Sequence, residues 1–180
     1  MTNYIDCSNK NTRKRIFEII GKLHQGVKLA DDMGISNLLY NEAYIDLLIA
    51  AHLGHKYNIE TQGADALDRK NNFVEYKCIV KKGGKYSGSF QFHWLSTEKI
   101  TKYRECKYFY FAWRDELKIE KIIQVEAKIL LPEIERKAGK AGSTAGHKSF
   151  SCGQIEKLVE EKKATVVFGK KIKQYEVRIK

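Results

Sequence analysis

Two carboxylates and one lysine are closely spaced in the middle of the chain, at Asp65, Glu75 and Lys77. The segment FVEYKCIV, residues 73–80, is rich in β-branched and aromatic residues, which predicts a strand. Residues two apart in a strand leave the same face, so Glu75 and Lys77 should point the same way. The turn-rich segment before this strand predicts an antiparallel hairpin, whose first arm includes Asp65 and can bring it to that face.

The chemistry that these three residue types favour is metal-assisted hydrolysis of a phosphodiester. Two carboxylates held a few ångströms apart repel each other unless a cation lies between them, and hard oxygen ligands suit Mg²⁺. The backbone carbonyl of Tyr76 could add a third oxygen. A bound metal lowers the pKa of its water and stabilises the charge that develops at phosphorus. Lys77 would hold the phosphate and help to position or deprotonate the attacking water.

Other interpretations of the same residues remain open. An Asp followed by Glu-x-Lys is a short pattern, and it is also typical of a solvated strand face with an ordinary Glu–Lys pair. Asp68 could replace Asp65 as the metal ligand, although we expect it to build the turn. Glu42 and Glu60 could each supply a supplementary acid, but a solvated surface carboxylate is the simpler interpretation of both.

The charge balance points to an acidic partner. The 180 residues include 33 Lys and Arg against 22 Asp and Glu, a net charge of +11. Nucleic acid is the first expectation and an anionic membrane surface the second, while a merely soluble basic protein remains open. The four cysteines include no Cys-x-x-Cys, so we expect no structural zinc. No secretory leader and no membrane span are apparent, so we expect a cytoplasmic protein with free thiols.

The order of predicted elements indicates a mixed α/β domain rather than a regular β-α-β alternation. Apolar spacing predicts helices over 12–32, from Ser36 to near Gly54, from Ser96 to Tyr103, over 127–138 with Pro132 in the first turn, and over 153–162. Strands are predicted over 73–80, 108–113, 117–125, 165–169 and 175–179, with an extended segment over 89–94. The Gly- and Ser-rich segments 81–89 and 139–149 are expected to be loops, the second of them mobile.

The segment GADALDRKNNFVEYK resembles the motif of the PD-(D/E)XK nucleases, and most closely that of the PvuII-like type II restriction endonucleases. LADDMGISNLLY, TKYREC with KYFYFAWR, and GHKSF resemble further segments of that family in the same order, over about residues 29–168. The resemblance implies an α/β (α+β) fold with a mixed central β-sheet and flanking helices. It also implies that Asp65 and Glu75 bind Mg²⁺, expected as two ions per site, and that Lys77 is catalytic.

The base-reading positions diverge from the family more than the catalytic ones do. His93 matches a histidine that reads bases in the major groove, and Ser151 and Cys152 replace a pair of asparagines. Because each good base contact contributes roughly 1–3 kcal/mol of discrimination, this divergence predicts a different recognition sequence. His147 and Lys148 suit phosphate contact, although an ordinary basic loop is nearly as good an interpretation. The expected DNA-contacting residues are Asn37, Gln91, Phe92, His93, His147, Lys148, Ser149, Ser151, Cys152 and Gln154.

Taken together, these features predict a type II restriction endonuclease that acts as a homodimer on a short palindrome in double-stranded DNA and leaves 5′-phosphates. Within one domain, the resemblance implies that residues 1–55 dimerise and that residues 56–168 form the catalytic and recognition core, and residues 169–180 are an unmatched extension. Blunt cutting would follow the family, and a separate DNA methyltransferase is an expected partner. The alternatives are a repair or junction-resolving nuclease of the same superfamily and a non-catalytic basic DNA-binding module.

Overall fold

The structure is a computed structural model that describes residues 10–35, 38–39, 43–59, 63–86, 88–137 and 146–169. The chain divides into two compact units, Met1–Tyr44 and Ile45–Lys180. The boundary between these units lies within the second helix. The first unit carries helix α1 (Lys10–Asp32), close to the predicted bounds. No helix in the described ranges has both the length and the apolar character needed to cross a membrane.

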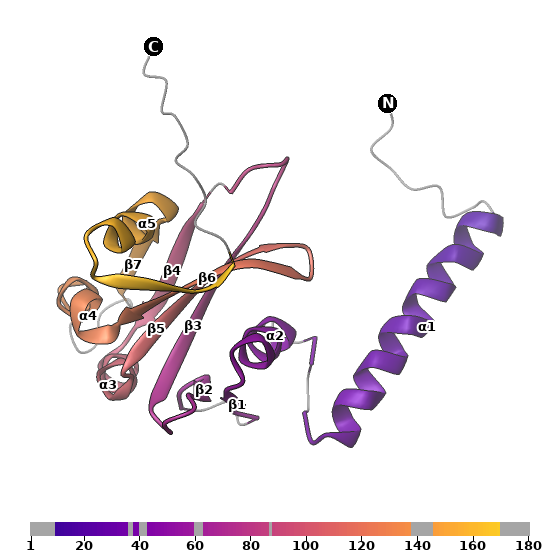
Figure 1. The fold of residues 1–180 in the computed structure, drawn as a ribbon. Helices are drawn as coiled ribbons and strands as arrows, with labels where there is room; N and C mark the ends of the chain where they lie inside the picture. The colour runs from indigo at the N-terminus through magenta and orange to yellow at the C-terminus, as the bar shows by residue number, and fades with distance from the viewer. Residues whose placement is uncertain are drawn as a thin grey trace, which may run out of the picture. The chain divides into compact units, whose positions relative to one another are not determined.

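A mixed six-stranded sheet forms the centre of the second unit, in the order β1-β2-β3-β5-β6-β8 (Figure 1). Its strands are β1 (Lys56–Tyr57), β2 (Ala66–Leu67), β3 (Phe73–Val80), β5 (Tyr108–Asp115), β6 (Lys118–Glu126) and β8 (Ala164–Gly169). Strands β3 and β5 are parallel, and the other neighbours are antiparallel. A separate antiparallel pair consists of β4 (Ser89–Leu95) and β7 (Gly146–Ser151). The predicted mixed central sheet with flanking helices is confirmed.

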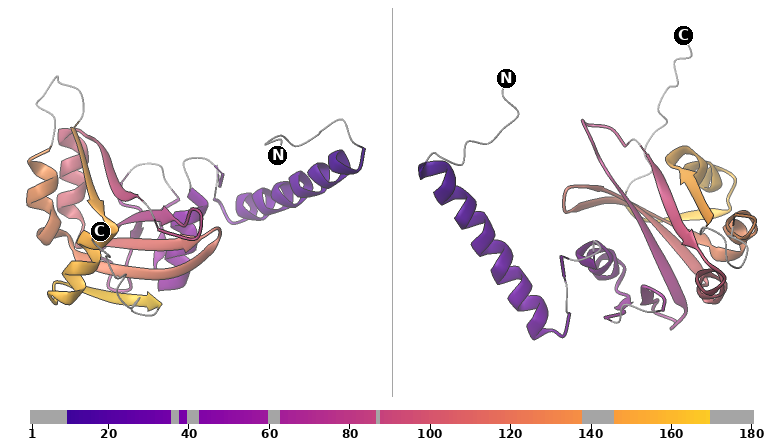
Figure 2. Two further views of the ribbon diagram at one scale, coloured as in Figure 1. Left: turned by 90° about the horizontal axis from the view of Figure 1, so that it is seen from above. Right: turned by 180° about the vertical axis from the view of Figure 1, so that it is seen from behind.

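Different elements cover the two faces of the sheet (Figures 1 and 2). Helices α3 (Thr97–Glu105), α4 (Ala127–Glu135) and α5 (Cys152–Glu160) lie with β4 and β7 on one face, while α2 (Ala43–Leu53) lies toward the other. The first face contains the main aromatic core, in which Phe92 packs edge-on against Tyr103, Phe109 and Phe150. Strand β5 is buried on both faces, which explains its nearly continuous aromatic sequence.

Local signals account for the elements that carry the candidate site. Ser96 caps α3, because its hydroxyl accepts a hydrogen bond from the backbone N–H of Lys99. Asp68 builds the β2–β3 turn as expected, since its Oδ1 accepts from the backbone N–H groups of Lys70 at 2.8 Å and Asn72 at 2.9 Å. Asp65 directly precedes β2, and its N–H donates to the carbonyl of Val74 on β3. The hairpin therefore places Asp65 beside Glu75.

Three predictions of local structure were wrong. The second helix begins at Ala43, and Leu38 and Leu39 form a turn before it. Helix α4 begins at Ala127, which puts Pro132 inside the helix rather than in its first turn, and one backbone hydrogen bond is lost there. Residues 146–149 belong to strand β7 instead of a loop, because β4 supplies a partner for their backbone groups. The strand predicted over 175–179 lies outside the described residues.

Candidate active site

The structure brings Asp65, Glu75 and Lys77 together at one end of the β2–β3 hairpin. The Lys77 Nζ lies 2.6 Å from Glu75 Oε1 and 3.0 Å from the backbone carbonyl oxygen of Tyr76. The backbone N–H of Tyr76 donates to Asp65 Oδ2 at 2.7 Å, which holds the Asp65 carboxylate against β3. The side chain of Glu75 is only 4% exposed, whereas that of Asp65 is 19% exposed. The predicted convergence of these groups is therefore present in the fold.

A second lysine, which the sequence analysis did not single out, joins this cluster from α3. The Lys102 Nζ lies 3.1 Å from Glu75 Oε2 and 3.6 Å from Asp65 Oδ1, so it bridges the two carboxylates. Lys102 belongs to the segment TKYREC, which resembles a segment of the family, but that resemblance did not imply a role for this lysine. Two carboxylates and two ammonium groups thus balance one another in a partly buried cluster.

Burial and neighbouring charges shift the pKa values of the cluster's groups in different directions. Burial, followed by repulsion from Glu75, raises the pKa of Asp65 to about 6. Burial opposes ionisation of Glu75 as well, but its contacts with Lys77 and Lys102 outweigh that effect and lower its pKa. Burial also opposes the charge on Lys77, yet the adjacent Glu75 raises the Lys77 pKa above its usual value. In this arrangement Lys77 is a cation, suited to contact with a phosphate rather than to proton abstraction.

The oxygen atoms of the cluster fit a hard divalent cation. Asp65 and Glu75 each offer a carboxylate oxygen, the Tyr76 carbonyl faces the same space, and two ammonium groups already lie against these atoms. Within the described ranges, no group of three or more His, Cys, Asp or Glu side chains is arranged to hold a metal. A metal here would therefore need water and substrate oxygens to complete its coordination, as Mg²⁺ commonly does.

The β4–β7 pair carries most of the residues expected to contact DNA. His93 and His147 are exposed, and their Nδ1 atoms lie 3.0 Å apart. Gln91 lies opposite Ser149 in the register, and its Nε2 donates to the Ser89 hydroxyl at 2.6 Å. Two exposed histidines and two half-buried polar side chains thus form one side of this ribbon.

One of the expected DNA contacts was wrong. Phe92 is completely buried, with three aromatic rings packed edge-on around it. The pleat of β4 sends Phe90 and Phe92 into the core and Gln91 and His93 outward. Phe92 therefore stabilises the fold and cannot touch a base.

Several other expected contacts are engaged within the protein. The Lys148 Nζ pairs with Glu133 at 2.5 Å and lies 4.5 Å from the centroid of the Phe150 ring. Ser151 and Gln154 form a capping box at the start of α5, in which each side chain accepts a hydrogen bond from the backbone N–H of the other. Their contacts with DNA remain predictions, as does that of the half-buried Cys152. Asn37, Glu42 and Glu60 lie outside the described residues.

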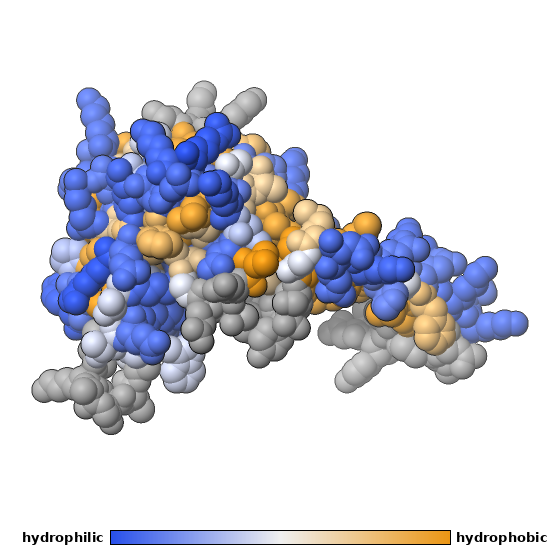
Figure 3. Space-filling model, turned by 90° about the horizontal axis from the view of Figure 1, so that it is seen from below, coloured by the Kyte–Doolittle hydropathy of each residue, from blue (hydrophilic) through white to orange (hydrophobic). Residues whose placement is uncertain are grey.

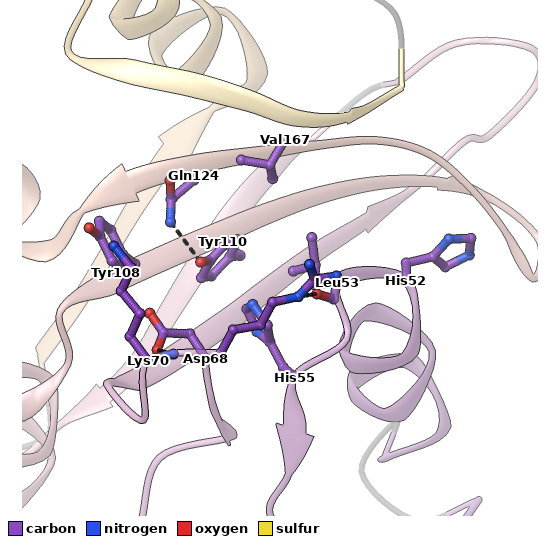
Figure 4. Close-up of a pocket in the computed structure, with 10 residues that line it drawn as sticks. His52, Leu53, His55, Asp68, Lys70, Tyr108, Tyr110, Gln124 and Val167 are labelled. Atoms are coloured by element: carbon purple, nitrogen blue, oxygen red, sulfur yellow. Dashed lines mark hydrogen bonds between the residues drawn. The ribbon is translucent and has the colours of Figure 1, made fainter.

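A separate polar pocket of about 430 Å³ lies on the opposite face of the sheet (Figure 4). The side chain of Tyr76 leaves β3 on that face, and its hydroxyl lies 2.8 Å from His55 Nδ1. His55, Tyr110 and Gln124 line the pocket, and Gln124 Nε2 donates to the Tyr110 hydroxyl. The pocket is therefore distinct from the Asp65–Glu75–Lys77 cluster, although the backbone of Tyr76 connects the two faces.

Comparison with known proteins adds one finding to this geometry. A family model described as restriction endonuclease PvuII matches residues 10–159, well over half of the chain. No curated protein matches the chain significantly. The matched range includes the whole acidic cluster, Lys102 and both histidines of the β4–β7 ribbon.

Proposed function

This chain belongs to the restriction endonuclease PvuII family, a family of nucleases, and from that premise we propose that it is a Mg²⁺-dependent type II restriction endonuclease. The observation that carries the proposal is the convergence of two carboxylates and a lysine ammonium at the end of the hairpin. The substrate is double-stranded DNA with a short palindromic site. The net charge of +11 supports this choice, because phosphate contacts dominate the affinity for DNA.

Asp65, Glu75 and the Tyr76 carbonyl would hold Mg²⁺, with two ions per site, and the metal would supply an activated water and charge neutralisation. Lys77 binds a non-bridging oxygen of the scissile phosphate and positions it for in-line attack. In-line attack would form a bond from a water oxygen to phosphorus and break the bond to the 3′-oxygen. The water would release a proton to solvent and the 3′-oxygen would take one up, which leaves a 5′-phosphate and a 3′-hydroxyl. Lys102 keeps the two carboxylates together before substrate and metal arrive, because its Nζ lies between them.

We propose that the enzyme is a homodimer, because a palindrome presents the same half-site to each chain. The N-terminal helices are the proposed contact, and α1 supports this role with large apolar side chains that are exposed. Phe17, Ile20 and Leu23 recur at intervals of three residues, and apolar groups are visible along the helix in Figure 3. Cytoplasmic location and a companion methyltransferase, which would protect the host DNA, belong to the same proposal.

Digestion of a plasmid of known sequence, followed by sequencing of the ends, tests the proposal directly. We expect discrete Mg²⁺-dependent fragments whose ends reveal the recognition sequence and the stagger. Lys77→Ala should abolish cutting with DNA binding largely intact, while Lys118→Ala, at an exposed position on β6, should cut normally. Cutting confined to branched DNA would instead indicate a repair or junction-resolving enzyme, and a Lys77→Ala protein that cuts at the normal rate would refute the catalytic assignment.

A further inference from the structure

An irregularity in β4 turns a tryptophan away from the core. Phe92 and Leu95 are both fully buried, although regular alternation would put residues an odd number apart on opposite faces. The pairing of β4 with β7 shifts register between these two residues. As a result, His93 and Trp94 both face outward, whereas a regular strand would have placed Trp94 on the same side as Phe92.

The exposed position of Trp94 is unfavourable for the fold alone. Its side chain is 74% exposed, while the chain's other tryptophan, Trp113, is 1% exposed. The backbone of Trp94 has φ 55°, in the left-handed region that bulky residues rarely adopt. Leu95 fills the core position instead. β-Bulges commonly re-aim a side chain beside an active site, and local strain of this kind is concentrated at functional positions.

The surroundings of Trp94 suit a polyanion that also has flat apolar surfaces. His93 is its neighbour in the chain, and His147 lies across the ribbon from His93 with ring centroids 4.6 Å apart. The Lys77 Nζ lies 5.2 Å from the centroid of the Phe92 ring, and Phe92 immediately precedes His93 on β4, so the candidate active site lies beside this strand. A duplex whose phosphate contacts Lys77 would therefore lie close to β4.

We propose that Trp94 is a DNA-contacting residue whose indole packs against base edges in the groove next to the scissile phosphate. Base edges offer apolar surface such as the thymine methyl group, and apolar side chains can also wedge between base steps. This inference rests on the proposed function, because it takes duplex DNA as the occupant. It adds a specificity-determining residue, placed by the bulge, to the polar groups of the β4–β7 ribbon.

Tryptophan fluorescence tests this contact, since the wild-type protein has one exposed and one buried indole. The probe is a duplex that carries the mapped cleavage site, titrated in EDTA so that no cutting occurs. We expect the emission of the wild type to be quenched and Trp94 to become protected from acrylamide. A Trp94→Phe protein, which retains only Trp113, should show neither change. Heparin, a polyanion without bases, should not reproduce the protection.

A binding comparison gives an independent measure. Trp94→Ala should weaken binding to the site-bearing duplex about tenfold, which lies within the range for an aromatic contact with a base. Leu117→Ala is the matched control, because Leu117 is also exposed but lies in the β5–β6 turn. The inference is overturned if Trp94 stays accessible to acrylamide while the duplex is bound and later cut on addition of Mg²⁺, a result that leaves the proposed function intact. Equal protection by heparin would also overturn it, whereas a protein that cuts no duplex in Mg²⁺ would overturn both.

Discussion

Replacing Asp65 with asparagine should stabilise the metal-free protein at neutral pH, even though it should abolish cleavage. Burial and the adjacent Glu75 raise the pKa of Asp65 to about 6, so ionisation of this group at pH 7 costs free energy in the native state. Asparagine has nearly the same shape, and its carbonyl oxygen can still accept the hydrogen bond from the Tyr76 N–H. The substitution therefore removes an unfavourable charge and keeps the contact that holds the side chain.

The shift of the Asp65 pKa sets the size of the effect. The rise from a usual value of 3.8 to about 6 corresponds to about 3 kcal/mol of destabilisation at pH 7. This shift already includes the attraction to Lys102, and the 19% exposure of the Asp65 side chain lets solvent screening reduce the gain that is realised. The net expectation is a gain of about 1–3 kcal/mol, or a rise in Tm of about 2–12 °C for a chain of this size.

The pH dependence of the effect follows from proton binding. Between pH 3.8 and about 6 the native carboxyl holds more proton than the unfolded one, so the contribution of this group to wild-type stability improves as pH falls through that window. The advantage of Asp65→Asn should therefore be largest above pH 6 and disappear near pH 4.

Urea and thermal unfolding in EDTA at pH 7.5 and pH 4.5 measure the prediction. Asp115→Asn is the control, since that carboxylate is 46% exposed and should change stability little. The reasoning would be refuted by an Asp65→Asn protein that is less stable than wild type at pH 7.5. It would also be refuted if the variant exceeded the wild type in free energy of unfolding by the same amount at both pH values.

Three further predictions concern the core, the bridging lysine and the partner. Phe92→Ala should destabilise the protein by about 3–5 kcal/mol in urea unfolding, because Phe92 is buried; a loss of DNA binding at unchanged stability would contradict its assignment to the core. Lys102→Met should lower the Tm in EDTA and increase the stabilisation by added Mg²⁺, because the carboxylates lose a cation; an unchanged Tm would contradict the bridging role. DNA binding should weaken steeply with salt, and a flat profile would contradict phosphate recognition.

The sequence predicted best those elements whose signals are local. The run at 73–80 became β3 with the predicted bounds, because its β-branched and aromatic residues favour a strand in nearly any setting. Ser96 capped α3 as expected, since a hydroxyl at that position satisfies a free backbone N–H of the first turn. The aromatic run that begins at Tyr108 was predicted as a central strand because both of its faces had to be buried.

Elements that depend on distant partners were missed. Residues 146–149 are rich in small and polar side chains, which indicate a loop. They nevertheless form a strand, because their backbone groups pair with β4, which lies more than fifty residues earlier in the sequence. Lys102 was missed for the same reason. Its position on α3 gives no sign that packing of the helix against the sheet will bring its ammonium between Asp65 and Glu75. In contrast, Glu75 and Lys77 needed only the period of one strand, and Asp65 only its hairpin.

The error at Phe92 shows how strand geometry limits the transfer of roles by resemblance. The resemblance to the family implied a DNA contact at this position, but the pattern Phe90–Gln91–Phe92–His93 alternates apolar and polar residues, which assigns Phe92 to the core. As far as His93, the alternation of apolar and polar residues therefore predicts the buried side of β4 better than the resemblance does. It then fails at Trp94, because the bulge shifts the pattern by one residue and Leu95 becomes buried. The side of β4 that is free to meet DNA is thus decided by where the strand departs from its period, and a residue-by-residue resemblance does not reveal that position.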